Sequence, residues 1–305
     1  MAHIIVHADD FGISREASDS ILEAHISGCI DRTSVLPNGE AFEYAVQLLK
    51  ENPGLQYAVH LNLVEGKALS DRKKIPDLVD NNGFFKHSFL SLWTLYLLHR
   101  KKRSDLLKQI KEELSRQIFR VRNALGCKEV TLDSHRYVHM LPFIWHMLNR
   151  LAKEWNIAGM RTPFEPFFLV KPFHRNVRNM FSGNLMKHMI LNTLSKKAVK
   201  SIRPGTISHP DYFIGVLFGG SMSLDVVRAA AQRLLKGKLH AETEVEILFH
   251  PGHSTDEEGP FRKGSGRYDK YYVSENRGRE LQALLSPELK GYIRDIGSAH
   301  HASKR

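Results

Sequence analysis

Two adjacent carboxylates, Asp9 and Asp10, are the first residues whose type and place point to chemistry. They follow the short apolar run 4–6 and precede Gly12 and Ser14. A carboxylate at the end of a buried strand is costly unless it is paired or binds a cation. Because successive side chains of a strand point to opposite faces, one Asp can bind a metal ion while the other handles a proton. The alternative is that both residues only begin a turn.

Histidines occupy the ends of three further β-type runs. His60 lies in the run 57–63, His135 follows the run 129–134, and His250 ends the run 244–250. Imidazole binds zinc and many other divalent ions, and carboxylates complete such sites. A single strand histidine is more often a packed core residue than a ligand. No His-Glu-x-x-His pattern is present, which disfavours a zinc-protease helix.

These residues recur at one kind of position. Arg161 also follows a β-type run, so six polar residues fall at or near the C-terminal ends of predicted strands: Asp9, Asp10, His60, His135, Arg161 and His250. In a βα barrel, active sites lie on the face that these strand ends form. One such residue would mean little, whereas packing needs do not readily explain six. We therefore expect them to converge.

The elements that position these residues alternate along the chain. Strands are predicted at 3–8, 33–37, 57–63, 129–134, 157–161, 213–218 and 244–250, and helices at 14–28, 40–52, 104–125, 140–156, 223–236 and 274–285. This alternation predicts βα units around a parallel sheet. In 305 residues, it predicts an α/β fold with one closed or nearly closed βα barrel of the TIM type; the alternative is a doubly wound open sheet. The barrel is expected over 1–290, with a tail over 291–305.

Two segments interrupt the alternation. Segment 88–103 is strongly apolar and ends in four cations, and segment 172–204 mixes Met, Leu and Phe with many Lys and Arg. Apolar residues beside clustered cations are typical of an interfacial helix on anionic lipid. The alternative is a pair of amphipathic helices packed on the barrel with a basic outer face. We expect no nucleic-acid partner, because no recognised nucleic-acid motif accompanies the cations.

The overall composition agrees with an anionic partner. Lys and Arg outnumber Asp and Glu by 44 to 33, for a net charge of +11, although a solvated basic surface would give the same balance. No run reaches the roughly 18 apolar residues of a membrane span, and the start of the chain lacks a basic signal region. Cys29 and Cys127 lack metal-site spacing and are expected as free thiols. We expect a cytoplasmic protein, with peripheral contact at the inner face of the membrane as an option.

The motifs together resemble a known family. Ala8-Asp-Asp-Phe-Gly12, His60-Leu-Asn-Leu63 with Glu65-Gly-Lys67, Asp133-Ser-His-Arg-Tyr-Val-His139 and His250-Pro251 match the YdjC-like carbohydrate deacetylases in order and spacing. This family includes the chito-oligosaccharide deacetylase and hopanoid-associated branches. The likeness extends to about residue 285, with segments 88–103 and 172–204 outside the common core. His7 departs from the small or amide residue usual at its position.

The resemblance implies a distorted βα barrel that hydrolyses an N-acetyl group of an amino sugar. It implies one divalent metal ion held by Asp10, His60 and His135. Magnesium is the ion associated with the family, whereas two imidazoles with a carboxylate suit zinc. Asn62 and His139, which lie in the same motifs, are assigned to substrate binding.

The resemblance also implies the roles of three residues around the metal. A bound ion polarises the acetyl carbonyl and lowers the pKa of a water. Asp9 is then the base that takes the proton of the water, and protonated His250 is the acid that donates to the departing amine. Arg161, in Arg-Thr-Pro, resembles the element that orients the base.

The substrate and two alternative functions stay open at this point. The apolar and basic segments favour an amino sugar on a lipid, such as a hopanoid or polyprenyl glycolipid, over a free chito-oligosaccharide. A metal-dependent phosphoesterase could use the same Asp and His residues. A basic lipid-binding barrel with a purely structural metal ion is the non-catalytic alternative. The oligomeric state is open, a homodimer included.

Overall fold

The protein is described by a computed structural model that defines residues 2–173, 183–236, 242–252 and 274–298. Its centre is a seven-stranded sheet in which every pairing is parallel, in the order β5-β4-β3-β2-β1-β7-β6. The strands are β1 (His3–Phe11), β2 (Arg32–Val35), β3 (Gln56–Leu61), β4 (Val130–Ser134), β5 (Ile157–Met160), β6 (Tyr212–Ile214) and β7 (Glu244–Phe249). Parallel sheets are covered on both faces, which explains why nearly all residues of β1 and β7 are buried, the polar ones included.

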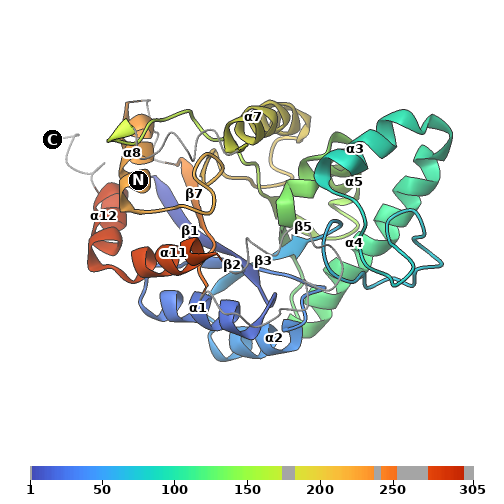
Figure 1. The fold of residues 1–305 in the computed structure, drawn as a ribbon, viewed down its shortest axis with the longest axis horizontal. Helices are drawn as coiled ribbons and strands as arrows, with labels where there is room; N and C mark the ends of the chain where they lie inside the picture. Colours follow the sequence, from blue (N-terminus) through green and yellow to red (C-terminus); the bar gives the residue numbers. More distant parts are fainter. Residues whose placement is uncertain (1, 174–182, 237–241, 253–273, 299–305) are drawn as a thin grey trace.

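The helices lie around this sheet (Figure 1). They are α1 (Arg15–Ile26), α2 (Phe42–Glu51), α3 (Phe89–Leu98), α4 (Arg103–Leu125), α5 (Pro142–Leu151), α7 (Asn184–Ser201), α8 (Leu224–Leu235), α11 (Glu275–Leu285) and α12 (Pro287–Ser298), with short 3-10 helices η1 (Arg100–Lys102) and η2 (His135–Met140). Helix α4 shows why they pack as they do. Its buried residues Leu106, Ile110, Leu114, Ile118 and Val121 recur every three or four positions and form one apolar stripe.

The sheet curls, but its two edge strands do not form a ladder with each other. Ser208 bridges β5 through hydrogen bonds from Met160 N (2.9 Å) and to Ala158 O (2.8 Å). Phe213 of β6 donates to the carbonyl of Phe164, which follows β5 (2.8 Å). The α/β class and the parallel curled sheet are therefore confirmed. Complete closure of the expected TIM-type barrel is not, because only such single contacts join β5 and β6 in the described residues.

All seven predicted strands and all six predicted helices are present, with their ends shifted by up to five residues. Three further α-helices, α3, α7 and α12, occur in the described part of the chain. Helices α3 and α7 occupy the two interrupting segments, although residues 174–182 of the second segment lie outside the described part of the chain. Helix α12 runs through residue 290, where the sequence placed the end of the barrel. None of the helices in the described ranges is both long and apolar enough to span a bilayer.

The turn after β1 is built by Gly12 and Ser14. Gly12 has φ +89°, and a Cβ there would lie 3.2 Å from the Cβ of Ala45. The hydroxyl of Ser14 accepts from Ala17 N at 3.1 Å and so caps the N-terminus of α1. Such a cap contributes about 1 kcal/mol. The abrupt change from strand to helix leaves Asp9 and Asp10 at the C-terminal end of β1.

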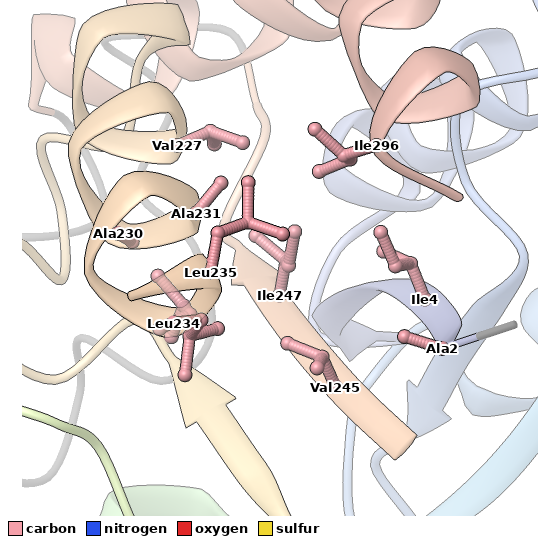
Figure 2. A pocket seen from close by; sticks show the side chains of 11 residues that line it. Ala2, Ile4, Val227, Ala230, Ala231, Leu234, Leu235, Val245, Ile247 and Ile296 are labelled. Atoms are coloured by element: carbon pink, nitrogen blue, oxygen red, sulfur yellow. The ribbon is translucent and has the colours of Figure 1, made fainter. Parts of the chain in front are cut away.

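An apolar pocket lies at the opposite end of the strands (Figure 2). Ile4 near the start of β1 and Val245 near the start of β7 form its floor, and Leu234 of α8 and Ile296 of α12 lie beside it. Its lining contains no charged side chain. This pocket is therefore separate from the polar residues that the sequence singled out.

Candidate active site

An irregularity in β1 brings the carboxylates of Asp9 and Asp10 into the same group of polar side chains. The register between β1 and β2 shifts between Ala8 and Phe11, and Asp10 has φ +73°. The left-handed conformation costs a residue with a side chain about 1–2 kcal/mol, so its surroundings must hold it. The regular strand alternation assumed from the sequence is broken here. As a result, Asp9 lies 4.0 Å from Nε2 of His250, and Asp10 lies 3.1 Å from Nδ1 of His135.

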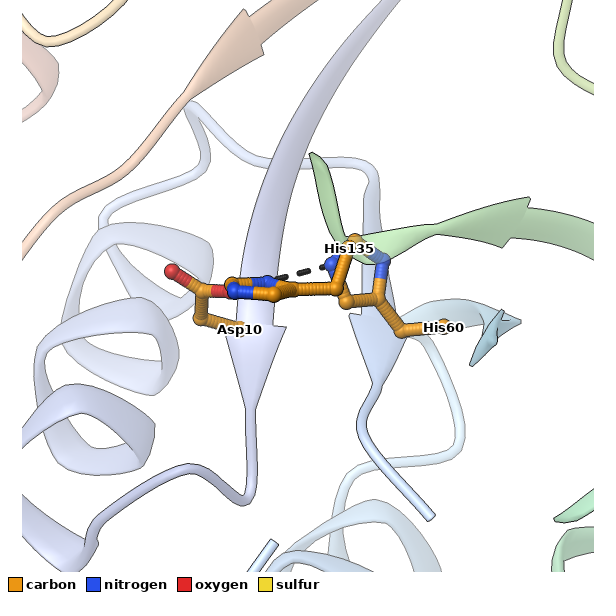
Figure 3. A group of neighbouring side chains, drawn as sticks. All are labelled: Asp10, His60 and His135. Atoms are coloured by element: carbon orange, nitrogen blue, oxygen red, sulfur yellow. Dashed lines mark hydrogen bonds and ion pairs between the residues drawn. The ribbon is translucent and has the colours of Figure 1, made fainter. Parts of the chain in front are cut away.

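Asp10, His60 and His135 converge as expected from the sequence. One possible ligand atom from each lies within 4.8 Å of the others, and all three residues are buried. Oδ1 of Asp10 lies 3.7 Å from Nε2 of His60 and 3.1 Å from Nδ1 of His135. Figure 3 shows the three side chains meeting from β1, β3 and the start of η2. Metal binding by this group stays a prediction, and its surroundings provide a test of it.

Each histidine of the group is held by a second carboxylate on its other ring nitrogen. Nδ1 of His60 bonds Asp133 Oδ1 at 2.7 Å, and Nε2 of His135 bonds Glu65. Carboxylates in this position fix the ring orientation of metal-binding histidines. Nε2 of His60 has no hydrogen-bond partner among the described residues, although it is buried. An unpaired buried nitrogen that faces a carboxylate oxygen fits a small divalent cation.

The donor set and its charge also fit a divalent ion. Two imidazole nitrogens and one carboxylate oxygen are ligands that Zn²⁺ prefers, whereas Mg²⁺ prefers oxygen alone. Burial lowers the pKa of His135, but the carboxylates of Glu65 and Asp10 outweigh burial and raise the pKa to about 9. Burial would raise the pKa of Asp10, yet His135 and Arg277 hold it well below the usual range. Negative charge around this group is therefore strong enough to hold a cation.

Arg161 binds the other carboxylate, Asp9, with two parallel hydrogen bonds. Nη1 donates to Oδ2 and Nη2 to Oδ1 of Asp9, each at 2.9 Å. The same guanidinium lies 2.8 Å from Asp133 and donates to Glu246 at 2.7 Å. Burial alone would raise the pKa of Asp9, but Arg161, with smaller contributions from His60 and His7, holds it well below its usual range. Asp9 is therefore ionised and fixed in orientation.

His7, Asp9 and Asp133 form a second group with metal-ligand residue types. Here Nη2 of Arg161 lies 2.9 Å from Asp9 Oδ1 and 2.8 Å from Asp133 Oδ2. The guanidinium thus already supplies the cation between these carboxylates. Nε2 of His7 lies 3.6 Å from Asp9, and Nδ1 lies 3.0 Å from Glu246. His7, which departs from the family pattern, is therefore part of a charged layer next to the Asp10 group. This layer consists of His7, Asp9, Asp133, Arg161 and Glu246.

His250 lies beside Asp9 at the end of β7 and is the most accessible of the six residues, with 16% of its side chain exposed. Burial lowers its pKa to about 4, although the charges of Asp9 and Asp10 act in the opposite direction. The ring is therefore neutral at pH 7 in this arrangement. Its expected role as an acid then requires that it receive a proton during the reaction.

Asn62 and His139 have no exposed surface. The amide of Asn62 donates to Asn38 and to the carbonyl of Glu65, and its oxygen accepts from Val64 N at 3.0 Å. His139 bonds the carbonyl of Arg161 at 2.9 Å. Both residues thus position others that matter to the site. Their assignment to substrate binding stays a prediction.

Several residues of the site carried no role in the sequence argument. Glu65 lies in a family motif, and its contact with His135 appears only in three dimensions. Arg277 and Glu280 approach from α11, where both are buried. The signal that could have found them is their spacing: they share a helical face with Leu281 and Leu284. Charged residues on an otherwise apolar face indicate buried partners.

The chain was compared with known proteins. The model of the family described as YdjC-like protein matches residues 3–295. A human carbohydrate deacetylase is 27% identical over 302 residues, which cover 96% of this chain and 88% of the relative. A mouse carbohydrate deacetylase is 27% identical over 303 residues, covering 96% and 91%.

The fold has a counterpart among solved structures. A crystal structure from Enterococcus faecalis V583, of a protein proposed there to be a cellobiose-phosphate cleavage protein, aligns with a TM-score of 0.68 and 23% identity. The alignment covers 97% of this chain and 95% of the other. This likeness supports the fold. The family match covers nearly the whole chain, and the protein therefore belongs to the YdjC-like family.

Proposed function

We propose that the protein is a metal-dependent carbohydrate deacetylase, a hydrolase that cleaves the N-acetyl amide of an amino sugar. The observation that carries the proposal is the meeting of Asp10, His60 and His135 next to Asp9, with a second carboxylate on each histidine. The names of the human and mouse relatives support the same activity. An acetamide is a poor electrophile, so its hydrolysis needs activation of both the carbonyl and the water.

The proposed ligands of one divalent ion are Oδ1 of Asp10, Nε2 of His60 and Nδ1 of His135. When bound, the ion supplies Lewis acidity for the acetyl oxygen and lowers the pKa of a water. Zn²⁺ matches the donor types, and Mg²⁺ is implied by the family resemblance.

The chain's own residues then move the protons. Asp9, held in one plane by Arg161, accepts the proton of the attacking water. His250 is neutral at rest and lies 4.0 Å from Asp9, so it can receive the proton that Asp9 takes from the water. Protonated His250 then donates to the sugar nitrogen, because an amine leaves only with a proton.

The second part of the proposal concerns the surface of the protein that would contact a membrane. Helix α3 is almost entirely apolar, yet of its residues only Leu92 is buried. Leu90, Leu97 and Leu98 are 54%, 52% and 72% exposed. The cations 100–103 follow directly. An apolar helix beside a block of cations has the chemistry of a peripheral contact with anionic lipid.

This surface lies near the candidate active site. Both α3 and α7 contact η2, the segment that begins with His135. Helix α7 adds Met186 and Met189, which are 62% and 64% exposed. We therefore favour an amino sugar on a lipid, presented by the inner face of a cytoplasmic membrane, over a free oligosaccharide.

Vesicle flotation tests the membrane part. The protein should float with phosphatidylglycerol vesicles at low salt and not with phosphatidylcholine vesicles. The double variant Leu97→Ser, Leu98→Ser should stay at the bottom. Ile26→Ser is the matched control, because Ile26 is 70% exposed on α1. Equal flotation of all three proteins, or none by the wild type, would refute the contact.

Acetate release tests the reaction. N,N′-diacetylchitobiose and an N-acetylglucosamine glycolipid are compared, with Zn²⁺, with Mg²⁺ and with chelator. The proposal predicts metal-dependent release that falls at least about a hundred-fold in Asp9→Asn. Asp105→Asn, at an exposed ion pair on α4, should leave release unchanged. If neither substrate releases acetate while phosphate monoesters are hydrolysed, the site is a phosphoesterase. If Asp9→Asn changes no activity, the metal group is only structural.

A further inference from the structure

Helix α11 carries two buried charges onto the site. Arg277 is 3% and Glu280 0% exposed, and they lie three residues apart on the face that also carries Leu281 and Leu284. Side chains three apart share one face of a helix. Burying charges on a core-facing stripe is unfavourable unless each has fixed partners. Here the partners belong to the site itself.

Arg277 contacts both Asp10 and the end of β7. Its Nη1 donates to Oδ2 of Asp10 at 3.1 Å, and its Nη2 donates to the carbonyl of Pro251 at 3.4 Å. Gly252 N donates back to the carbonyl of Arg277 at 3.3 Å. A Cβ on Gly252 would lie 2.9 Å from Nε of Arg277, so a larger residue there would displace the Arg277 side chain. Oδ2 of Asp10 is thereby occupied, and Oδ1 is the oxygen that faces His60 and His135.

Glu280 holds the backbone on the other side of the site. Its Oε2 accepts from His250 N at 2.6 Å, and its Oε1 accepts from Met222 N at 2.9 Å. Met222 lies in the connection between β6 and α8. Each carboxylate oxygen thus accepts from a different backbone N–H group. The carboxylate thus fixes the position of the backbone from which the His250 side chain extends.

We infer that α11 is a positioning element of the site. Arg277 orients Asp10 so that one oxygen, Oδ1, is presented to the metal position, and Glu280 sets the backbone from which His250 reaches the substrate. The inference rests on the proposed function for the roles of Asp10 and His250. It adds two residues from a helix that contributes no motif of its own.

The Zn²⁺ affinity of Arg277 variants distinguishes two roles of this residue: orienting the Asp10 carboxylate, or only compensating its charge. If Arg277 only neutralised Asp10, its removal would leave a more negative ligand and tighten binding of Zn²⁺. If it orients Asp10, Arg277→Met weakens Zn²⁺ binding about 10- to 100-fold, the usual effect of losing a residue that positions a ligand. Arg277→Lys keeps the charge with fewer hydrogen bonds and should lie between Met and wild type.

The experiment titrates metal-free protein with Zn²⁺ by calorimetry and requires no turnover. Arg279→Met is the matched control, because Arg279 lies on the same helix but is exposed and paired with Glu275. Unchanged or tighter Zn²⁺ binding in Arg277→Met would overturn the inference. If Arg277→Met does not fold, Arg277→Lys is used in its place, and unchanged or tighter Zn²⁺ binding in that variant would overturn the inference.

Kinetics test Glu280 in the whole chain at saturating metal. Glu280→Gln keeps the size but offers one acceptor, so kcat should fall about ten-fold or more while KM and Zn²⁺ affinity stay near wild type. Glu275→Gln, at an exposed position on α11, should leave kcat unchanged. A change in KM alone, or no change, contradicts the role of Glu280. If the wild type released no acetate but Arg277→Met still weakened Zn²⁺ binding, the deacetylase proposal would fail and the role of Arg277 would stand.

Discussion

Glu165 gives the protein a stability that depends on pH in an unusual direction. This buried carboxylate accepts from the backbone N–H groups of Gly215 (2.7 Å), Val216 (3.2 Å) and Leu217 (2.8 Å). Burial raises its pKa to about 7, although the three N–H donors act in the opposite direction. In the unfolded chain the same group titrates near 4.5.

The sign and size of the effect follow from these two values. Between about pH 4.5 and pH 7 the folded protein keeps a proton on Glu165 that the unfolded chain has released. The free energy of unfolding therefore falls as the pH rises through this window, and it levels off above pH 7. A difference of about 2.5 pKa units corresponds to a loss on the order of 3 kcal/mol. Glu280, whose pKa burial also raises to about 7, contributes in the same direction.

Glu165→Gln tests this reasoning, because glutamine cannot titrate. Glutamine offers a single acceptor oxygen to the three N–H groups, so the variant loses hydrogen bonding at every pH. We expect the fall in the free energy of unfolding between pH 5 and pH 8 to be smaller in the variant than in the wild type, by up to about 3 kcal/mol. Urea denaturation at the two pH values measures this fall, with the exposed Glu129→Gln as control. A variant that shows the same fall as the wild type would refute the reasoning, because Glu165 would then not titrate in this window.

Three further changes test other parts of the structure. Glu65→Gln removes the carboxylate on His135, so calorimetry should show Zn²⁺ binding weakened about 10- to 100-fold, with the partly exposed Glu112→Gln unchanged. Arg161→Met leaves three carboxylates without their common cation, and urea denaturation should show a loss of about 3–5 kcal/mol; a loss below about 1 kcal/mol would contradict the charged layer. Gly12→Ala meets a positive φ and a close neighbour, so its melting temperature should fall by an amount that corresponds to about 1–2 kcal/mol, and an unchanged value would argue against this turn.

The sequence was sufficient to predict the strands and the residues at their ends. Buried parallel strands appear in the sequence as apolar runs, and several of these runs end in polar residues, so position along the chain indicates one face of the sheet. Asp10, His60 and His135 meet for this reason. The segments that interrupt the pattern were also visible, because their composition differs from that of the βα units.

The remaining features depend on contacts that periodicity does not encode. The shift in β1 places Asp9 and Asp10 in one site, whereas regular alternation would separate them. Helix α3 is apolar on nearly all sides and so lacks a helical period. Arg277 reaches Asp10 across 267 residues, a pairing that one sequence cannot show. Whether the barrel closes depends likewise on the few contacts near β5 and β6, such as that of Ser208 with β5.

The most direct test of the central claim is a titration of metal-free protein with Zn²⁺ that follows bound metal and acetate release together, using an N-acetylglucosamine substrate. We predict that release rises with bound Zn²⁺ and reaches its maximum at about one ion per chain, as expected for a single group of Asp10, His60 and His135. Acetate release that is independent of bound metal, or one bound ion with no release from any N-acetylated sugar, would contradict the assignment of this site as a metal-dependent deacetylase.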